Sequence, residues 1–244
     1  MSAILFALAI AFLGCLAVAL IYADQPGEER AIRGFVLSIL LSSGIGLGFY
    51  VLGRKGSSRF FQKEALCVIG VGWILASLVG ALPYLIVEGI SPVDAYFESA
   101  SGLTTTGASV FSEVESLPRS LLFWRSLSQW IGGMGVVVFF VAILGFLGAG
   151  GRILYANEAS GFTADFEESR VQSAVKKLWT LYLGLSVVCT LVYWIGGMGW
   201  YDAICHMFTT LSTGGFSTHN ASMAAFESPF LEWAATGFMV IGGT

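Results

Sequence analysis

Two short polar segments, each set in apolar sequence, constrain the fold of this chain more than any other feature. The first covers Thr104–Ser109 and the second covers Ser212–Ser217, and an Asp-Ala pair precedes each segment at the same distance, beginning at Asp94 and at Asp202. A single ungapped alignment therefore matches the two regions. Repetition at this scale indicates two copies of one structural unit arranged with pseudo-symmetry around a shared site.

The surrounding sequence is too apolar for a water-soluble protein. Of the 244 residues, 56% are hydrophobic and only 11% are charged, whereas soluble domains carry about 25% charged residues. A helix needs about 20 apolar residues to cross a bilayer. The sequence predicts an all-α integral membrane protein with six spans, at residues 3–22, 34–52, 65–87, 120–148, 175–196 and 228–244.

The polar segments follow apolar stretches that are too short to cross a bilayer. Residues 93–103 and 201–211 would each form a helix of about 16 Å, which ends near mid-depth of the membrane. The C-terminal end of a helix carries about half a negative charge, and two such ends aimed at one cavity would stabilise a dehydrated cation. We expect Asp94 and Asp202 to cap the N-terminal ends of these half-length helices rather than to contact an ion.

The composition of the two segments favours a filter made of backbone carbonyl and threonine oxygens. Extended backbone at membrane depth leaves carbonyl groups unpaired, which is tolerated where they line an ion pathway. Glycine permits the dihedral angles that turn successive carbonyls to one side, and the lack of carboxylates in both segments argues against a filter for divalent cations. A single Gly/Ser/Thr segment could be a plain turn, but two at matched positions are specific. The candidate ion-binding residues are Thr104, Thr105, Thr106, Gly107, Ser212, Thr213, Gly214 and Gly215.

The distribution of basic residues predicts the orientation in the membrane. Lys and Arg side chains gather at residues 54–63 and 152–177, and the positive-inside rule places both regions in the cytoplasm. The N-terminus then faces the cytoplasm and both polar loops face outward. Several carboxylates flank the loops on that side, where they would concentrate cations or serve as ordinary solvated loop charge.

Other ionisable residues suggest structural roles. Arg125 lies near the outer end of the fourth predicted span, and we expect it to form a structural ion pair with Glu98 rather than extend to the interface. His206 and His219 lack the closely spaced partners of a zinc site, and the four cysteines are best explained as packing residues. The chain carries no motif of a hydrolase, metalloprotease or nucleotide-binding enzyme, so we expect no enzymatic activity, cofactor or nucleic-acid partner.

The chain resembles the Trk/Ktr/HKT superfamily of potassium transporters, most closely membrane subunits of the TrkH type. The resemblance rests on the segment Thr104–Ser109, on the stretch FWRSLSQWIGGMG at Phe123–Gly135, and on Ser212–Ser217. It implies four helix–pore-loop–helix repeats around a pseudo-fourfold axis, with one filter strand from each. It also implies that the filter glycines, here Gly107 and Gly215, favour potassium. The resemblance further implies a homodimer in the bacterial inner membrane that binds a cytoplasmic nucleotide-binding regulatory ring.

The chain departs from this pattern because it carries two repeats rather than four. We expect a two-helix region at 1–63, a first repeat at 64–148, a cytoplasmic linker at 149–174 and a second repeat at 175–244 that is cut short. We expect a piece of a longer four-repeat transporter; a natural half-protein that pairs with a second copy is the alternative. The expected function is conduction of potassium, and a non-conducting assembly or anchor protein is the alternative.

Overall fold

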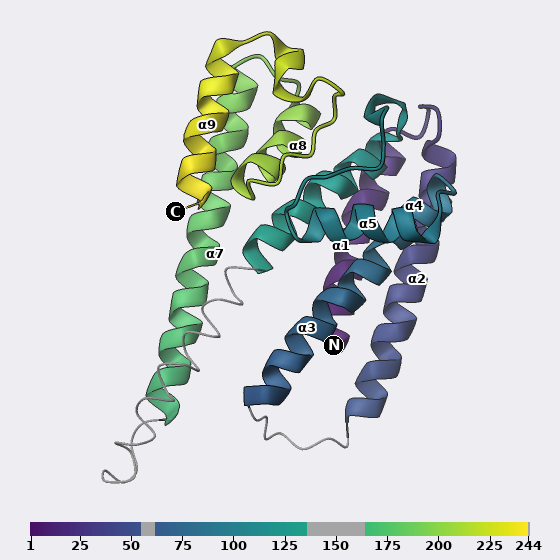
Figure 1. The fold of residues 1–244 in the computed structure, drawn as a ribbon, viewed down its shortest axis with the longest axis vertical. Coiled ribbons are helices and arrows are strands. Elements are labelled where there is room, and N and C mark those ends of the chain that lie inside the picture. Colours follow the sequence, from purple (N-terminus) through teal and green to yellow (C-terminus); the bar gives the residue numbers. More distant parts are fainter. Residues whose placement is uncertain (55–61, 136–163, 244) are drawn as a thin grey trace.

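The computed structural model describes residues 1–54, 62–135 and 164–243, and every regular element within these ranges is a helix (Figure 1). The all-α class predicted from the sequence is therefore confirmed. In chain order the helices are α1 (Ser2–Ile21), α2 (Glu28–Gly53), α3 (Gln62–Gly80), α4 (Leu82–Val87), α5 (Pro92–Leu103), η1 (Val114–Ser116), a helix over 119–135, α7 (Ala164–Ile195), α8 (Trp200–Leu211), η2 (Ser222–Phe226) and α9 (Pro229–Gly243).

Four of the predicted membrane spans correspond to helical segments that are long and apolar enough to cross a bilayer. These are Ser2–Ile21, Glu28–Gly53, Cys67–Val87 and Ser173–Ile195. The third consists of α3 and α4, which meet at Ala81 just before Pro83. The fourth predicted span is described only over 119–135, and α9, which corresponds to the sixth, has 15 residues.

Helix α7 begins at Ala164, within the segment predicted as a linker at 149–174. Residues 164–174 are rich in Glu, Arg, Gln and other polar residues, which favour helix without favouring the membrane. Hydropathy therefore located the apolar part of this helix but not its first residue. The rest of the predicted linker, the end of the fourth predicted span, and Lys55 and Arg59 lie outside the described residues.

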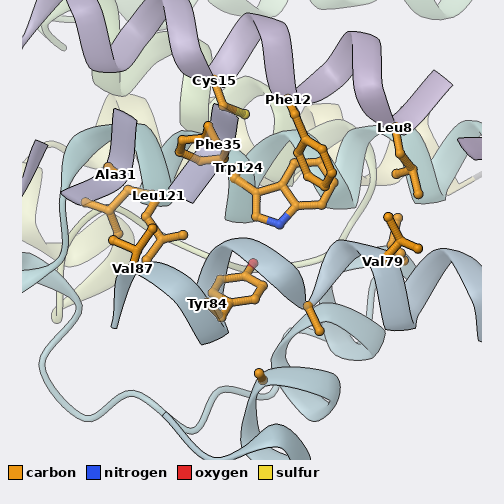
Figure 2. Packing of buried hydrophobic residues seen from close by; sticks show 14 of the residues in the cluster. Leu8, Phe12, Cys15, Ala31, Phe35, Val79, Tyr84, Val87, Leu121 and Trp124 are labelled. Atoms are coloured by element: carbon orange, nitrogen blue, oxygen red, sulfur yellow. The ribbon is translucent and has the colours of Figure 1, made fainter. Parts of the chain in front are cut away.

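The two N-terminal helices share a core with the first repeat (Figure 2). Trp124, on the helix over 119–135, is fully buried and packs edge-on against Phe12 of α1, with ring centroids 4.7 Å apart. Its indole N–H donates to the carbonyl of Gly80 at the end of α3, at 3.1 Å. This single side chain therefore joins α1 and α3 to the helix that follows the first polar loop.

A buried carboxylate fixes the start of the helix over 119–135. Glu28, the first residue of α2, accepts hydrogen bonds from the backbone N–H of Ser120 at 3.1 Å and from its hydroxyl at 2.6 Å. The first N–H groups of a helix have no partner within the helix, and a negative charge there is stabilised by the helix dipole. Glu28 thus supplies a cap from a distant part of the chain.

A second core lies between α7, α8 and α9. Trp130, on the helix over 119–135, connects this core to the first repeat. Its indole N–H donates to the hydroxyl of Ser186 on α7 at 3.0 Å, and its carbonyl accepts from the hydroxyl of Tyr182 at 3.2 Å. The helix over 119–135, which belongs to the first repeat, therefore packs against α7 and joins the two repeats.

Candidate functional site

Helices α5 and α8 are matched in length and position. Each has 12 residues, or about 18 Å, and the alignment that matches the sequence motifs also matches both ends of the two helices. Each helix ends at a hydroxyl residue that bonds back to its own last turn. The Thr104 hydroxyl donates to the carbonyl of Ala100 at 2.7 Å, and the Ser212 hydroxyl donates to that of Phe208 at 2.8 Å. These two hydroxyls therefore help to terminate the half-length helices.

The backbone of the two polar loops also repeats. Thr105 and Thr213 have φ angles of 55° and 52°, and Gly107 and Gly215 have φ angles of 75° and 84°. The left-handed region is costly for a residue other than glycine, by about 1–2 kcal/mol, so its use at both threonines indicates a conformation that the surroundings impose. The two loops therefore adopt one geometry, and the glycines occupy positions that favour glycine.

The same backbone hydrogen bonds hold each loop against its helix. The N–H of Thr106 donates to the carbonyl of Ser101, and the N–H of Gly214 donates to that of Thr209, both at 2.9 Å. The alignment of the two segments pairs the two donors with each other and the two acceptors with each other. The internal repeat seen in the sequence is thus a repeat of backbone conformation.

The two loops lie against one another. A Cβ atom added to Gly107 would overlap the carbonyl oxygen of Gly214. Of the predicted ion-binding residues, Thr104, Thr106, Thr213 and Gly215 are exposed, and Ser212 and Gly214 are buried. The structure therefore brings the two sequence-predicted segments together and leaves part of each uncovered within the described chain.

A buried ion pair ties the exits of both loops to the helix over 119–135. Arg125 Nε lies 2.8 Å from Glu98 Oε1, and the two side chains are 2% and 0% exposed, so the predicted structural ion pair is confirmed. Glu98 also accepts hydrogen bonds from the Ser109 hydroxyl and the Val110 N–H after the first loop. Arg125 donates to the carbonyl of Ser217 after the second loop at 3.2 Å. A buried charge is tolerated where it is paired and fully hydrogen-bonded.

The second repeat makes the equivalent loop contact with a different side chain. Nε2 of His206, on α8, lies 2.9 Å from the Ser217 hydroxyl, and its Nδ1 lies 2.8 Å from the carbonyl of Asp202. His206 is only 2% exposed, so this histidine is packed rather than solvated. No group of three or more His, Cys, Asp or Glu residues in the described ranges is arranged to hold a metal ion.

The predicted helix caps require a correction. The N-cap of α5 is Ser91, whose hydroxyl oxygen accepts from the N–H of Asp94 at 3.1 Å while the hydroxyl donates to the Asp94 carboxylate at 2.8 Å. The N-cap of α8 is Gly199, and Asp202 accepts from the Thr218 hydroxyl at 2.6 Å. Both aspartates occupy the third helical position. In α5 the reason is that Pro92 favours the first position of a helix, so the residue before it takes the extended cap geometry.

Asn220 joins the segments that follow the two polar loops. Its side-chain oxygen accepts from the N–H of Val114 at 2.8 Å, and its amide nitrogen donates to Glu113 at 2.7 Å. The backbone N–H of Asn220 donates to Glu115 at 3.1 Å. Glu113 and Glu115 therefore hold the segment after the second loop in place.

Comparisons with known proteins identify the family of this chain. The TrkH family, described as a cation transport protein, matches residues 31–244. The chain belongs to the TrkH family. Because this is a family of transport proteins, the expectation that the chain is not an enzyme is also confirmed.

Individual TrkH relatives match nearly all of the chain. It is 40% identical over 229 residues to the Trk system potassium uptake protein TrkH of Escherichia coli K12, covering 93% of this chain and 46% of the relative. It is 37% identical over 217 residues to the Trk system potassium uptake protein TrkG of the same organism, covering 88% of this chain and 45% of the relative. The crystal structure of the potassium transporter TrkH from Vibrio parahaemolyticus superimposes with a TM-score of 0.83 at 34% identity, over 98% of this chain and 47% of that one. The chain thus spans about half the length of the relatives that it matches.

Several residues that shape the TrkH loops were not among the predicted site residues. They are Ser109, Ser217, His206 and Gln129. The ungapped alignment of the two repeats pairs Ser109 with Ser217, so that pair carried a signal. The alignment also pairs Glu98 with His206, but because the two residue types differ, the sequence alone does not indicate that they occupy equivalent positions.

Proposed function

We propose that this chain contributes two adjacent parts of the ion pathway of a potassium uptake transporter. The observation that carries the proposal is the repeated backbone of the loops at Thr104–Gly107 and Ser212–Gly215, which meet at Gly107 and Gly214. Backbone carbonyls and threonine oxygens of these loops replace the hydration shell of potassium. The relatives named above are potassium uptake proteins or transporters, and they are about twice as long as this chain.

The electrostatics of the half-length helices support a cation at this position. The C-terminal ends of α5 and α8 lead directly into the loops, and their partial negative charges favour a nearby cation without trapping it as a carboxylate would. Glu98, the buried carboxylate close to the loops, is already paired with Arg125. Selection therefore rests on neutral oxygens, which suits a monovalent ion.

The remaining parts of the proposal follow the family. The ring is completed by two further repeats, and the transporter lies in the bacterial inner membrane with its N-terminus in the cytoplasm and its loops outward. It acts as a homodimer with a cytoplasmic nucleotide-binding regulatory ring. Exposed apolar side chains on α1, α2 and α7, such as Ile10, Leu40 and Leu181, suit contact with lipid or further transmembrane helices.

The test is potassium flux through the purified native transporter in liposomes. Rubidium uptake driven by an inward gradient should exceed that of empty liposomes and should be blocked by excess potassium. The alternative, a non-conducting assembly or anchor protein, predicts uptake equal to that of empty liposomes.

A further inference from the structure

The side chain of Gln129 lies buried between the two repeats, and half of its amide group is unpaired. Gln129 is 0% exposed on the helix over 119–135. Its Oε1 accepts from the backbone N–H of Phe216 at 3.1 Å, and its Nε2 has no hydrogen-bond partner among the described residues. Because the Phe216 nitrogen is a donor, the atom facing it must be the oxygen, which fixes the orientation of the amide.

The unpaired nitrogen lies where the two loops meet. A Cβ atom added to Gly214 would overlap the Gln129 amide, and one added to Gly107 would lie 3.8 Å from Nε2. The Gly214 carbonyl oxygen lies against Gly107 at the same place. The amide group is therefore packed against Gly214 and lies beside Gly107.

A purely space-filling role does not account for this arrangement. Met or Leu would fill a similar volume but would leave the buried Phe216 N–H without its acceptor, whereas Gln129 pairs that N–H and leaves its own Nε2 unpaired. Nε2 makes no hydrogen bond to a loop carbonyl among the described residues, so what it adds at this junction is the partial positive charge of its N–H groups, beside carbonyl dipoles that repel one another. The geometry points to Gln129 as a positioning residue for ion selectivity, which fixes the spacing of the two loops at Gly107 and Gly214.

Among the described residues, the position in the second repeat that is equivalent to Gln129 carries no amide. Gly132 packs against the carbonyl of Leu103, and Gly242 packs against that of Leu211, so the two glycines are structurally equivalent. When they are aligned, Gln129 corresponds to Met239, which is 38% exposed. Within the described part of the chain, the amide therefore lies at the contact between the first and second loops, and Met239 takes the equivalent position in the second repeat.

The inference rests on the proposed function and is tested by selectivity rather than by total transport. Gln129→Glu keeps the length and an acceptor for Phe216 but removes both donors, and Gln129→Met keeps the volume without either polar atom. The matched control is Ser38→Ala, because Ser38 is also fully buried and its hydroxyl donates to the carbonyl of Gly34 within its own helix, α2. Each variant of the native transporter is purified, checked for a monodisperse fold, and assayed in liposomes for rubidium uptake in competition with potassium and with sodium.

The two readouts separate failure of this inference from failure of the proposed function. We expect both Gln129 variants to lower the preference for potassium over sodium by at least about 5-fold, while Ser38→Ala keeps the wild-type preference. A wild-type preference in either folded, conducting Gln129 variant overturns the positioning role and leaves the proposed function standing. Absence of rubidium uptake by the wild-type transporter overturns the proposed function itself.

Discussion

Glu98 and His206 occupy the same place in the two half-length helices, and each contacts the serine that follows its own loop. The Glu98 carboxylate accepts from the Ser109 hydroxyl at 3.0 Å, and His206 Nε2 lies 2.9 Å from the Ser217 hydroxyl. The fold therefore repeats the contact while the chemistry differs. The first loop is held by a charge that needs Arg125, and the second by a buried imidazole in place of that ion pair.

Breaking the Glu98–Arg125 pair should destabilise the protein strongly. Glu98→Gln leaves the buried Arg125 guanidinium without its counter-charge, and removing one partner of a buried pair costs about 3–5 kcal/mol. We expect a lower thermal unfolding temperature in detergent and a smaller folded yield. The control is Glu232→Gln on α9, because its backbone carbonyl accepts from Thr236 and the substitution leaves that carbonyl in place. Equal unfolding temperatures for Glu98→Gln and the control would contradict a stabilising pair.

His206 should tolerate a polar substitute better than an apolar one. His206→Leu leaves the Ser217 hydroxyl and the Asp202 carbonyl without this partner, at a cost of about 1–3 kcal/mol. His206→Gln retains hydrogen-bonding capacity at a similar reach and should lose less. Thermal unfolding of the two variants side by side measures the difference. If His206→Leu proved as stable as His206→Gln, these hydrogen bonds would make no net contribution to the stability of the fold.

Close backbone contact makes Gly132 intolerant of a side chain. A Cβ atom there would overlap the carbonyl of Leu103 at the end of α5, and overpacking of this kind costs about 1–3 kcal/mol. Gly132→Ala should therefore lower the unfolding temperature. Gly48→Ala on α2 is the control, since a Cβ atom at Gly48 meets no atom within 4 Å among the described residues. A Gly132→Ala variant as stable as Gly48→Ala would show that α5 shifts at little cost.

The Asn220 contacts predict a pH-dependent defect in Asn220→Asp. The new carboxylate would face Glu113, to which the Asn220 amide now donates at 2.7 Å, and like charges raise the pKa of a carboxyl group. A carboxyl group whose pKa is raised in the folded state lowers the stability of the folded protein at pH values above its unfolded-state pKa of about 3.9. This loss of stability becomes smaller as the pH falls and the carboxyl group is protonated. Unfolding temperatures measured between neutral and mildly acidic pH should show this variant approaching the wild type. Asn220→Ala adds no charge, so its unfolding temperature should stay below that of the wild type by a similar amount across this pH range.

The repeat itself was predictable from the sequence, but the residues that cap its helices and join its two copies were not. The matched positions of Asp94 and Asp202 anticipated the boundaries of α5 and α8, because matched residue types with matched spacing adopt matched local structure. The cap residues were misplaced by three positions, since Ser91 and Gly199 differ in type and only the aspartates repeat.

The contacts that join the two repeats depend on tertiary structure. Glu28 and Ser120 are far apart in the sequence, and the Gly107–Gly214 contact has no local signal. The packing of Gly132 and Gly242 shows that the second repeat is slightly longer after its loop than the first, which an ungapped comparison does not detect. Local pattern therefore predicted the elements and the loops, and long-range packing decided how they meet.

The most direct test of the proposed filter is the ion preference of Gly215→Ser. Gly215 has a φ of 84°, and a Cβ atom there meets no atom within 4 Å among the described residues, so the substitution alters loop conformation without a packing clash. With Gly48→Ser as control, rubidium uptake by the native transporter in liposomes is measured in competition with potassium and with sodium. We predict that Gly215→Ser lowers the preference for potassium by at least about tenfold while Gly48→Ser leaves it unchanged. A wild-type preference in a folded, conducting Gly215→Ser variant would contradict the assignment of these loops as the filter.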